Sequence, residues 1–292
     1  MMNKFKGILS ESGTISRVLL LVGTSIFFAT FGMLLWTVFT NRDLTDVNTI
    51  KTLQFVQAIG AFILPPLFLA YLWSNKPLKY LQLDKKTAGL EVVYVLIFMV
   101  LIIPAINLLG DLNQQLILPK GLEEIENWMK TSEEQAMIIT QQLLNVHTIQ
   151  GLLLNILLIA ILPAFGEELI FRGAFQRILQ DWKGAVFAIW VAAFVFSAIH
   201  LQFYGFLPRL LMGAFLGYLL LWSGNLWLPV LAHFTNNVLA VIFYYFKNNG
   251  YQLPDIDLIG TGNTVWLGIA SAAIGVFGIF FLKKQFEKTY VE

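Results

Sequence analysis

Long apolar runs constrain the fold of this chain more than any other feature. Eight stretches consist mainly of apolar residues: about 18–40, 54–74, 88–109, 149–179, 184–203, 206–223, 225–246 and 264–282. A helix of about 20 apolar residues spans the roughly 30 Å hydrocarbon core of a bilayer. Only 13% of the residues are charged, about half of the roughly 25% usual in soluble domains. The sequence therefore predicts an all-α polytopic membrane protein with about eight transmembrane helices.

Composition also excludes several classes of function. The formal net charge of +1 gives no electrostatic basis for binding nucleic acid. The chain has no cysteine, which excludes a disulfide framework and any cysteine-based metal site or nucleophile. The first apolar run is long for a signal peptide and is followed by no small-x-small cleavage site, so we expect it to be a retained helix.

The distribution of basic residues predicts the orientation in the membrane. With both termini in the cytoplasm, six of the 19 basic residues fall in outer segments, namely Arg42, Lys51, Lys120, Lys130, Arg209 and Lys247. The other 13 (19 minus six) fall in inner segments. Because cytoplasmic loops are enriched in Lys and Arg, this bias predicts cytoplasmic termini and an inner loop at 76–86.

One long polar stretch, about 110–148, separates the third and fourth apolar runs. Within it, Leu122, Ile125, Trp128 and Met129 recur at helical spacing against an acidic face. This pattern predicts an amphipathic helix on the outer membrane surface. Two roles remain open for it, a connector and a lid that controls substrate access.

The stretch "LPAFGEELIFRGAF" places charges inside an apolar run. Glu168 and Arg172 are four residues apart, so they share a helix face and are expected to form a structural ion pair. Glu167 lies about 100° further around the helix and needs another partner. Pro163 removes a helix hydrogen bond and Gly166 permits a close backbone approach, and both features favour a cavity beside Glu167.

Two of the three histidines also lie in apolar runs. His147 falls in the polar stretch and is expected to be exposed, whereas His200 and His233 are intramembrane. Counted from the turn near 181–184, Glu167 and His200 both lie about 25 Å deep at 1.5 Å per residue. His233 and Asn237 share a face of the seventh run, although His233 lies only about 12 Å from the start of its helix. The four side chains are expected to converge.

A carboxylate and two imidazoles in a cavity with little water allow two kinds of chemistry. They can activate water and stabilise an oxyanion. Alternatively, Glu167, His200 and His233 can hold a divalent metal such as zinc, since two histidines and a carboxylate are a known ligand set. Hydrolysis is the expected reaction in both cases, and no G-x-S-x-G, H-E-x-x-H or P-loop motif is present.

These residues resemble the CPBP family of intramembrane proteases, which includes CAAX prenyl endopeptidases and bacteriocin-processing proteins. The family pattern is E-E-x-x-x-R, then F-x-x-x-H, then H-x-x-x-N. The chain has "EELIFR" (Glu167–Arg172), "FSAIH" (Phe196–His200) and "HFTNN" (His233–Asn237) in that order. The resemblance covers about 149–246, with no departure at the motif positions.

The resemblance implies a role for each motif residue. Glu167 activates water together with His200, and His233 and Asn237 bind the oxyanion. Three residues support the site: Glu168, Arg172 and Phe196. This mechanism needs no cofactor, and a metal-dependent version is the alternative. A non-catalytic scaffold, or an immunity or regulatory membrane protein, is a further alternative, because the family includes such members. A transporter is disfavoured, since no repeat symmetry is visible.

We therefore expect three parts in an integral protein of a bacterial cytoplasmic membrane. Residues 1–148 supply transmembrane helices and the amphipathic segment, 149–246 form the protease-like core, and 247–292 form a loop and the last helix. The expected partners are the lipid bilayer and a membrane-associated peptide or protein substrate, with no nucleic acid.

Overall fold

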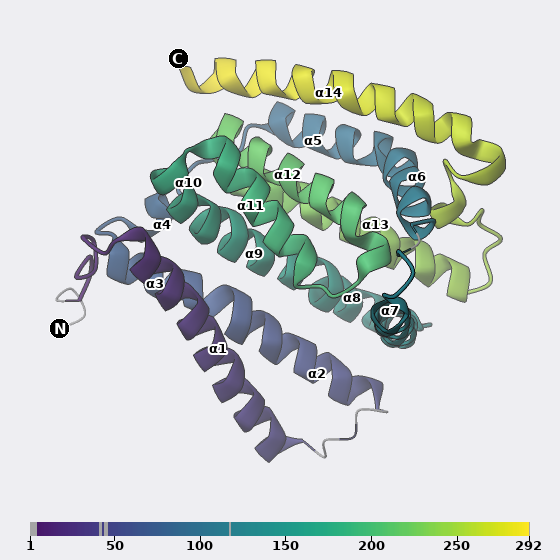
Figure 1. Ribbon diagram of the computed structural model, residues 1–292, viewed down its shortest axis with the longest axis horizontal. Coiled ribbons are helices and arrows are strands. Elements are labelled where there is room, and N and C mark those ends of the chain that lie inside the picture. The colour runs from purple at the N-terminus through teal and green to yellow at the C-terminus, as the bar shows by residue number, and fades with distance from the viewer. Residues whose placement is uncertain (1–4, 41–42, 44–45, 117, 292) are drawn as a thin grey trace.

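The computed structural model describes residues 5–40, 43, 46–116 and 118–291 of the 292-residue chain. Lys4 and Arg42, two of the basic residues counted above, lie outside this part. The described residues form helices and no strand, so the all-α prediction is confirmed (Figure 1).

The helices follow one another along the whole described chain. They are α1 (Thr14–Phe39), α2 (Val47–Gln57), η2 (Ala58–Ile63), α3 (Leu64–Trp73), α4 (Pro77–Tyr80), α5 (Gly89–Leu101), α6 (Ile103–Gln114), α7 (Glu123–Leu144), α8 (Ile149–Asn155), η3 (Ile156–Ile161), α9 (Leu162–Glu168), η4 (Leu169–Gln176), α10 (Arg177–Lys183), α11 (Ala185–Ala198), η5 (Phe203–Gly205), α12 (Phe206–Ser223), α13 (Trp227–Asn248), η6 (Ile256–Leu258), η7 (Gly262–Thr264) and α14 (Val265–Val291). The π-helical segments η2, η3 and η4 lie inside longer continuous helices. Residues 149–183, from α8 to α10, form one such helix of 35 residues.

The predicted count of eight full spans is not confirmed. Six helices in the described residues are long and apolar enough to cross a membrane, or seven if the bent pair α5 and α6 counts as one span. This pair bends by 42° beside Pro104, whose missing N–H breaks the helical hydrogen bonding. Helix α11 has only 14 residues, about 21 Å at 1.5 Å per residue, which is less than the roughly 30 Å core.

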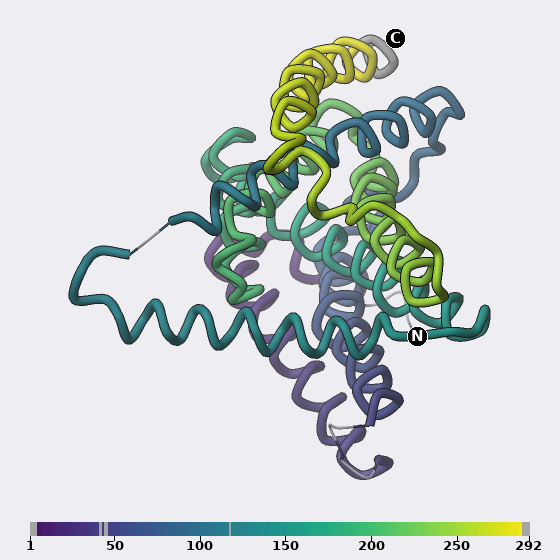
Figure 2. Tube along the Cα trace, turned by 90° about the vertical axis from the view of Figure 1, so that its right-hand side faces the viewer, coloured from purple at the N-terminus to yellow at the C-terminus, as the bar shows by residue number. Residues whose placement is uncertain are grey.

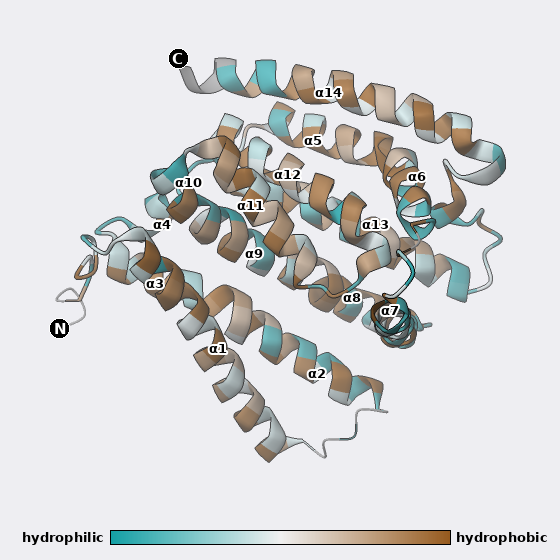
Figure 3. Cartoon of the chain, viewed as in Figure 1, coloured by the Kyte–Doolittle hydropathy of each residue, from teal (hydrophilic) through white to brown (hydrophobic). Residues whose placement is uncertain are grey.

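The helices pack as a bundle with apolar outer faces. Large apolar side chains such as Phe27 and Phe31 on α1, and Phe277 and Phe280 on α14, are exposed. Hydrophobic residues, in brown, recur along both helices (Figure 3). Such a surface is expected where lipid rather than water surrounds the protein. The chain is therefore an integral membrane protein.

Helix α7 takes a different direction from the rest of the bundle. It runs across one end of the molecule, where it contacts α2, α13 and η5 (Figure 2). Its first turn carries Glu123, Glu124 and Glu126, and Trp128 packs against Phe203 with ring centroids 5.3 Å apart. This arrangement agrees with an amphipathic helix at the membrane surface.

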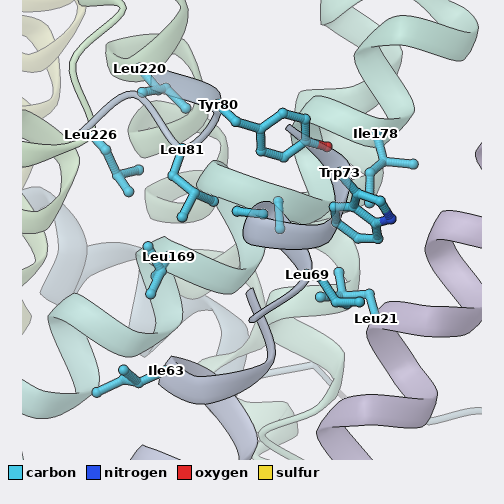
Figure 4. Close-up of a cluster of buried hydrophobic side chains, with 12 residues drawn as sticks. Leu21, Ile63, Leu69, Trp73, Tyr80, Leu81, Leu169, Ile178, Leu220 and Leu226 are labelled. Atoms are coloured by element: carbon cyan, nitrogen blue, oxygen red, sulfur yellow. The ribbon is translucent and has the colours of Figure 1, made fainter. Parts of the chain in front are cut away.

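The two largest of four buried clusters in the described residues make up most of the core. One joins side chains of α1, α3, η4, α10 and the start of α13, including Leu21, Leu69, Leu169, Ile178 and Leu226 (Figure 4). The other joins α5, α12, α13 and α14. Because lipid tails are as apolar as these side chains, close packing rather than transfer from water favours the association.

The bundle arrangement leads to a topological prediction. The end of α14, α4 and the α10–α11 turn lie at one end of the bundle, and α7 lies at the other (Figure 1). With the bias in basic residues, we expect the first end to face the cytoplasm. Reporter fusions after Lys86 and at the C-terminus should both give cytoplasmic signals. An extracytoplasmic signal at either fusion would contradict this orientation.

Candidate active site

The long helix from α8 to α10 presents the charged residues of the site. Pro163 is the second residue of α9, which starts directly after η3. A proline has no N–H for the carbonyl four residues earlier, and the π-helical turns before it accommodate this loss. At Gly166 an added Cβ would lie 3.0 Å from the Cβ of Phe62, which is tighter than an ordinary contact, so the glycine allows η2 to pack closely. This contact holds α9, the segment that contains Glu167, against η2.

Glu168 and Arg172 form the predicted ion pair. Arg172 Nη1 lies 2.7 Å from Glu168 Oε1, and both side chains are fully buried. Arg172 Nη2 donates to the carbonyl of Gly213 at 3.0 Å. An added Cβ at Gly213 would meet this Nη2 at 3.2 Å, so the glycine makes room for the guanidinium. The pair connects η4 to α12.

Glu168 has a second partner, His233. The Nδ1 atom of His233 lies 2.9 Å from Glu168 Oε1, and the residue is buried in α13. Because a carboxylate accepts hydrogen bonds, His233 donates from Nδ1. Its Nε2 atom then points to Glu167 Oε2, at 3.9 Å.

His200 lies near the same carboxylate oxygen of Glu167. It lies two residues after the end of α11, and its Nδ1 donates to the carbonyl of Phe196 at 2.7 Å. A carbonyl oxygen only accepts, so the proton of a neutral His200 is on Nδ1. Its Nε2 lies 3.9 Å from Glu167 Oε2. The structure therefore places two imidazole nitrogens around one carboxylate oxygen.

Phe196 packs at the centre of these groups. Its ring lies 5.0 Å from that of His200 and 6.0 Å from that of His233, both edge to face. The guanidinium carbon of Arg172 lies 4.6 Å from the same ring. These contacts restrict the rotation of both imidazoles and contribute a cation–π interaction.

Asn237 lies one turn after His233 on α13. Its Nδ2 donates to the carbonyl of Ile159 in a long hydrogen bond of 3.4 Å. Ile159 is four residues before Pro163, so the proline cannot use this carbonyl. The second N–H of the Asn237 amide remains available for a ligand.

The converging side chains line a common cavity of about 380 Å³. Its lining includes Glu167, His200, His233 and Asn237, together with Arg209. Side-chain exposures of 15% for Glu167 and 27% for His200 show that the site is shielded but reachable. The volume lies within the usual range for small-ligand sites.

The structure confirms the expected place of His147 but not that of Arg209. His147 is exposed and lies outside the cavity, as predicted. Arg209 was assigned only to an outer segment, yet it lines the cavity beside the candidate catalytic groups. A charged residue inside the apolar run 206–223 was the signal that could have identified it.

The residues as placed do not fit a metal centre. Two ligands of a tetrahedral zinc ion, each about 2.0–2.1 Å from the metal, lie about 3.3 Å apart. The two Nε2–Oε2 distances here are both 3.9 Å. In the described part of the chain, no group of three His, Asp or Glu side chains has the spacing to hold a metal ion.

Comparisons with known proteins cover the part of the chain that holds this site. Residues 149–239 match the family model described as type II CAAX prenyl endopeptidase Rce1-like. Over 84 residues the chain is 33% identical to the uncharacterized protein YpbD of Bacillus subtilis (strain 168), which corresponds to 27% of this chain and 40% of that protein. No solved structure matches. All the site residues, from Glu167 to Asn237, fall within the matched range. Residues 149–239 are therefore similar to the type II CAAX prenyl endopeptidases, which supports the resemblance to the CPBP membrane proteases over this part of the chain.

Proposed function

We propose that this protein is an intramembrane endopeptidase that hydrolyses a peptide bond of a membrane-associated peptide or protein. The observation that carries the proposal is the placement of Glu167 Oε2 at 3.9 Å from two imidazole Nε2 atoms within one cavity. A carboxylate with two nitrogen partners can bind and polarise one water molecule. The family match over 149–239 supports the same reaction class.

In the proposed mechanism, a water molecule lies between Glu167 and Nε2 of His200. Glu167 takes one proton from this water, and the oxygen adds to the carbonyl carbon of the substrate. The resulting tetrahedral intermediate loses the amine when the C–N bond breaks, and the proton on Glu167 passes to that amine. His200 orients the water, because its Nδ1–H is already engaged with Phe196.

The oxyanion is bound by His233 and Asn237 in this proposal. Asn237 supplies its free amide N–H. His233 can donate from Nε2 only in its protonated form, because its Nδ1–H is directed to Glu168. The buried carboxylate of Glu168 compensates the positive charge that this form carries. Glu168 thereby links the structural ion pair to the chemistry.

The direct test is a comparison of membranes from cells that express the wild-type protein or the Glu167→Gln variant. Mass spectrometry of membrane-bound peptides should reveal new chain ends only with the wild-type protein. Equal peptide sets, at equal protein levels, would instead support a non-catalytic scaffold or regulatory role.

A second measurement separates the water mechanism from a metal-dependent version. Loss of one oxyanion donor typically lowers the rate about 10²–10³-fold, so we expect this loss for Asn237→Ala. Asn248→Ala is the matched control, because Asn248 also lies on α13 but donates to the carbonyl of Leu144 and does not line the cavity; it should remain much closer to the wild type. Stoichiometric zinc in active protein, chelator inhibition reversed by zinc, and a nearly normal Asn237→Ala rate would together contradict the mechanism.

A further inference from the structure

A second polar cavity lies away from the catalytic one, at the end of the bundle that holds α4 and the α10–α11 turn (Figure 1). Its volume is about 180 Å³, and the two cavities have no described lining residue in common. The turn after α4, the segments η4 and α10, and the end of α12 form its wall. We call it the arginine pocket, after its polar lining of Gln82, Arg172, Gln176, Arg177, Gln180 and Asp181.

Three buried polar atoms of these side chains have no hydrogen-bond partner among the described residues. They are Arg172 Nε, Gln176 Oε1 and Arg177 Nε. Arg172 and Gln176 are each only 1% exposed, so bulk water does not compensate them. Buried polar groups in folded proteins are nearly always paired, and an unpaired one lowers stability. A bound polar molecule in the pocket would pair them.

Arg177 brings a positive charge without a close anion. Its Nη1 donates to the carbonyl of Tyr80, and its guanidinium carbon lies 4.4 Å from the centre of the Tyr80 ring. No described carboxylate lies within 4.0 Å of its nitrogen atoms, whereas Arg172 has Glu168 at 2.7 Å. The contacts with Tyr80 orient the guanidinium and leave its Nε and Nη2 edge, with two parallel N–H groups, for a ligand.

From these groups we propose that the arginine pocket binds a phosphate group that carries a hydroxylated substituent, as in the glycerophosphate headgroup of an anionic lipid. Phosphate oxygens match the paired N–H donors of a guanidinium edge. A bare phosphate would leave the acceptor Gln176 Oε1 unpaired and would be repelled by Asp181 at the exposed rim. A hydroxyl group donates to either acceptor. The lining therefore favours a ligand that has both an anionic oxygen and a hydroxyl.

The surroundings of the pocket favour a lipid as the source of this phosphate. Leu220 and Leu221 supply its apolar lining, and Leu221 is exposed on the outer face of α12. Trp182 and Lys183, at the end of α10, are also exposed. Aromatic and basic residues at a helix end are typical of the headgroup level of a membrane. A headgroup in the pocket can thus keep its acyl chains against the apolar surface beside Leu221.

Native mass spectrometry of the purified full-length protein, after removal of co-purified lipid, measures this binding. The probes are phosphatidylglycerol, phosphatidylcholine with the same acyl chains, and soluble glycerol 1-phosphate. Phosphatidylcholine keeps the phosphate but has a cationic headgroup without a hydroxyl. We expect the wild-type protein to bind phosphatidylglycerol at least about 10-fold more tightly than phosphatidylcholine, as for one charge-assisted hydrogen bond. Arg177→Gln should lose most of this preference.

A second variant keeps the test decisive if Arg177→Gln does not fold. Gln180→Glu is nearly isosteric and adds a carboxylate at the exposed rim, so it should weaken phosphatidylglycerol binding about as much. Lys183→Gln is the matched control. It changes the net charge by the same amount on the same helix, but Lys183 is exposed and does not line the pocket. It should bind phosphatidylglycerol nearly as the wild type does.

The three probes give separate outcomes, none of which uses peptide cleavage, so the inference is independent of the proposed function. Phosphatidylglycerol that glycerol 1-phosphate does not displace supports a lipid source, and ready displacement supports a soluble phosphate ester at the same site. Equal binding of both lipids by the wild-type protein would overturn the inference. Equal weakening by Gln180→Glu and Lys183→Gln would also overturn it, in favour of general attraction to surface charge. Folded wild-type protein that binds no probe would leave only water in the pocket and overturn it as well.

Discussion

The Glu167→Gln variant is expected to fold normally and to lose nearly all peptide cleavage. Glutamine has almost the shape of glutamate, but its amide cannot take a proton from water. The Nε2 atoms of His200 and His233 each lie 3.9 Å from Glu167 Oε2. The change to glutamine removes the negative charge beside them. General-base catalysis typically contributes about 10²–10⁴-fold, so we expect a rate loss of this size at unchanged protein level.

Turnover of an identified substrate by purified protein in vesicles measures this loss, with thermal unfolding as the check on folding. Glu126→Gln is the matched control, because Glu126 lies on α7 and pairs only with exposed Lys130 in the described structure. It should cleave at the wild-type rate. A Glu167→Gln variant that retains more than about a tenth of wild-type turnover would remove Glu167 from the base role.

Much of the site could be predicted because charge inside lipid is expensive. Glu167, Glu168, Arg172, His200 and His233 were recognisable as unusual residues in apolar runs. Their helical spacing then gave the ion pair and the expected convergence, and the structure brings these side chains together. Their catalytic roles remain predictions.

The depth of His233 in the membrane depends on how the helices pack, which counting residues along one helix does not give. Counted from the turn at the start of its helix, His233 appeared to lie less deep in the membrane than Glu167. In the structure, Leu226 at the start of α13 packs beside Gly173, where an added Cβ would lie 3.3 Å from it. The helix continues beyond Gly173 to Lys183, about 15 Å at 1.5 Å per residue. The α10–α11 turn therefore protrudes past the α12–α13 turn, and Glu167 and His233 lie at matching levels.

Other features depend on contacts that a single sequence does not contain. Apolarity continues through residues 184–203, so the early end of α11 at Ala198 was not visible. Leu201 adopts a left-handed φ of 54° just after His200, a conformation that is costly for a residue with a side chain. The surrounding structure stabilises this turn and with it the position of His200. The place of Arg209 in the cavity likewise follows from how α12 packs.

The second large effect concerns stability. Arg172→Ala is expected to lower the free energy of unfolding by about 3–5 kcal/mol, because it leaves a buried carboxylate without its cation. Glu168 is fully buried and would retain only His233 as an ionisable partner among the described residues. The change also removes the hydrogen bond to the Gly213 carbonyl and the contact with Phe196. Thermal unfolding in detergent should therefore show a clearly lower midpoint.

A paired variant distinguishes lost stability from lost chemistry. In Glu168→Gln, Arg172→Met, the ion pair is replaced by neutral groups of similar size, which often restores stability when a buried pair is removed as a whole. We expect most of the lost unfolding free energy to return. Activity should remain low, because glutamine cannot compensate a positive charge on His233. An Arg172→Ala protein that is as stable as the wild type but inactive would instead place Arg172 in the chemistry.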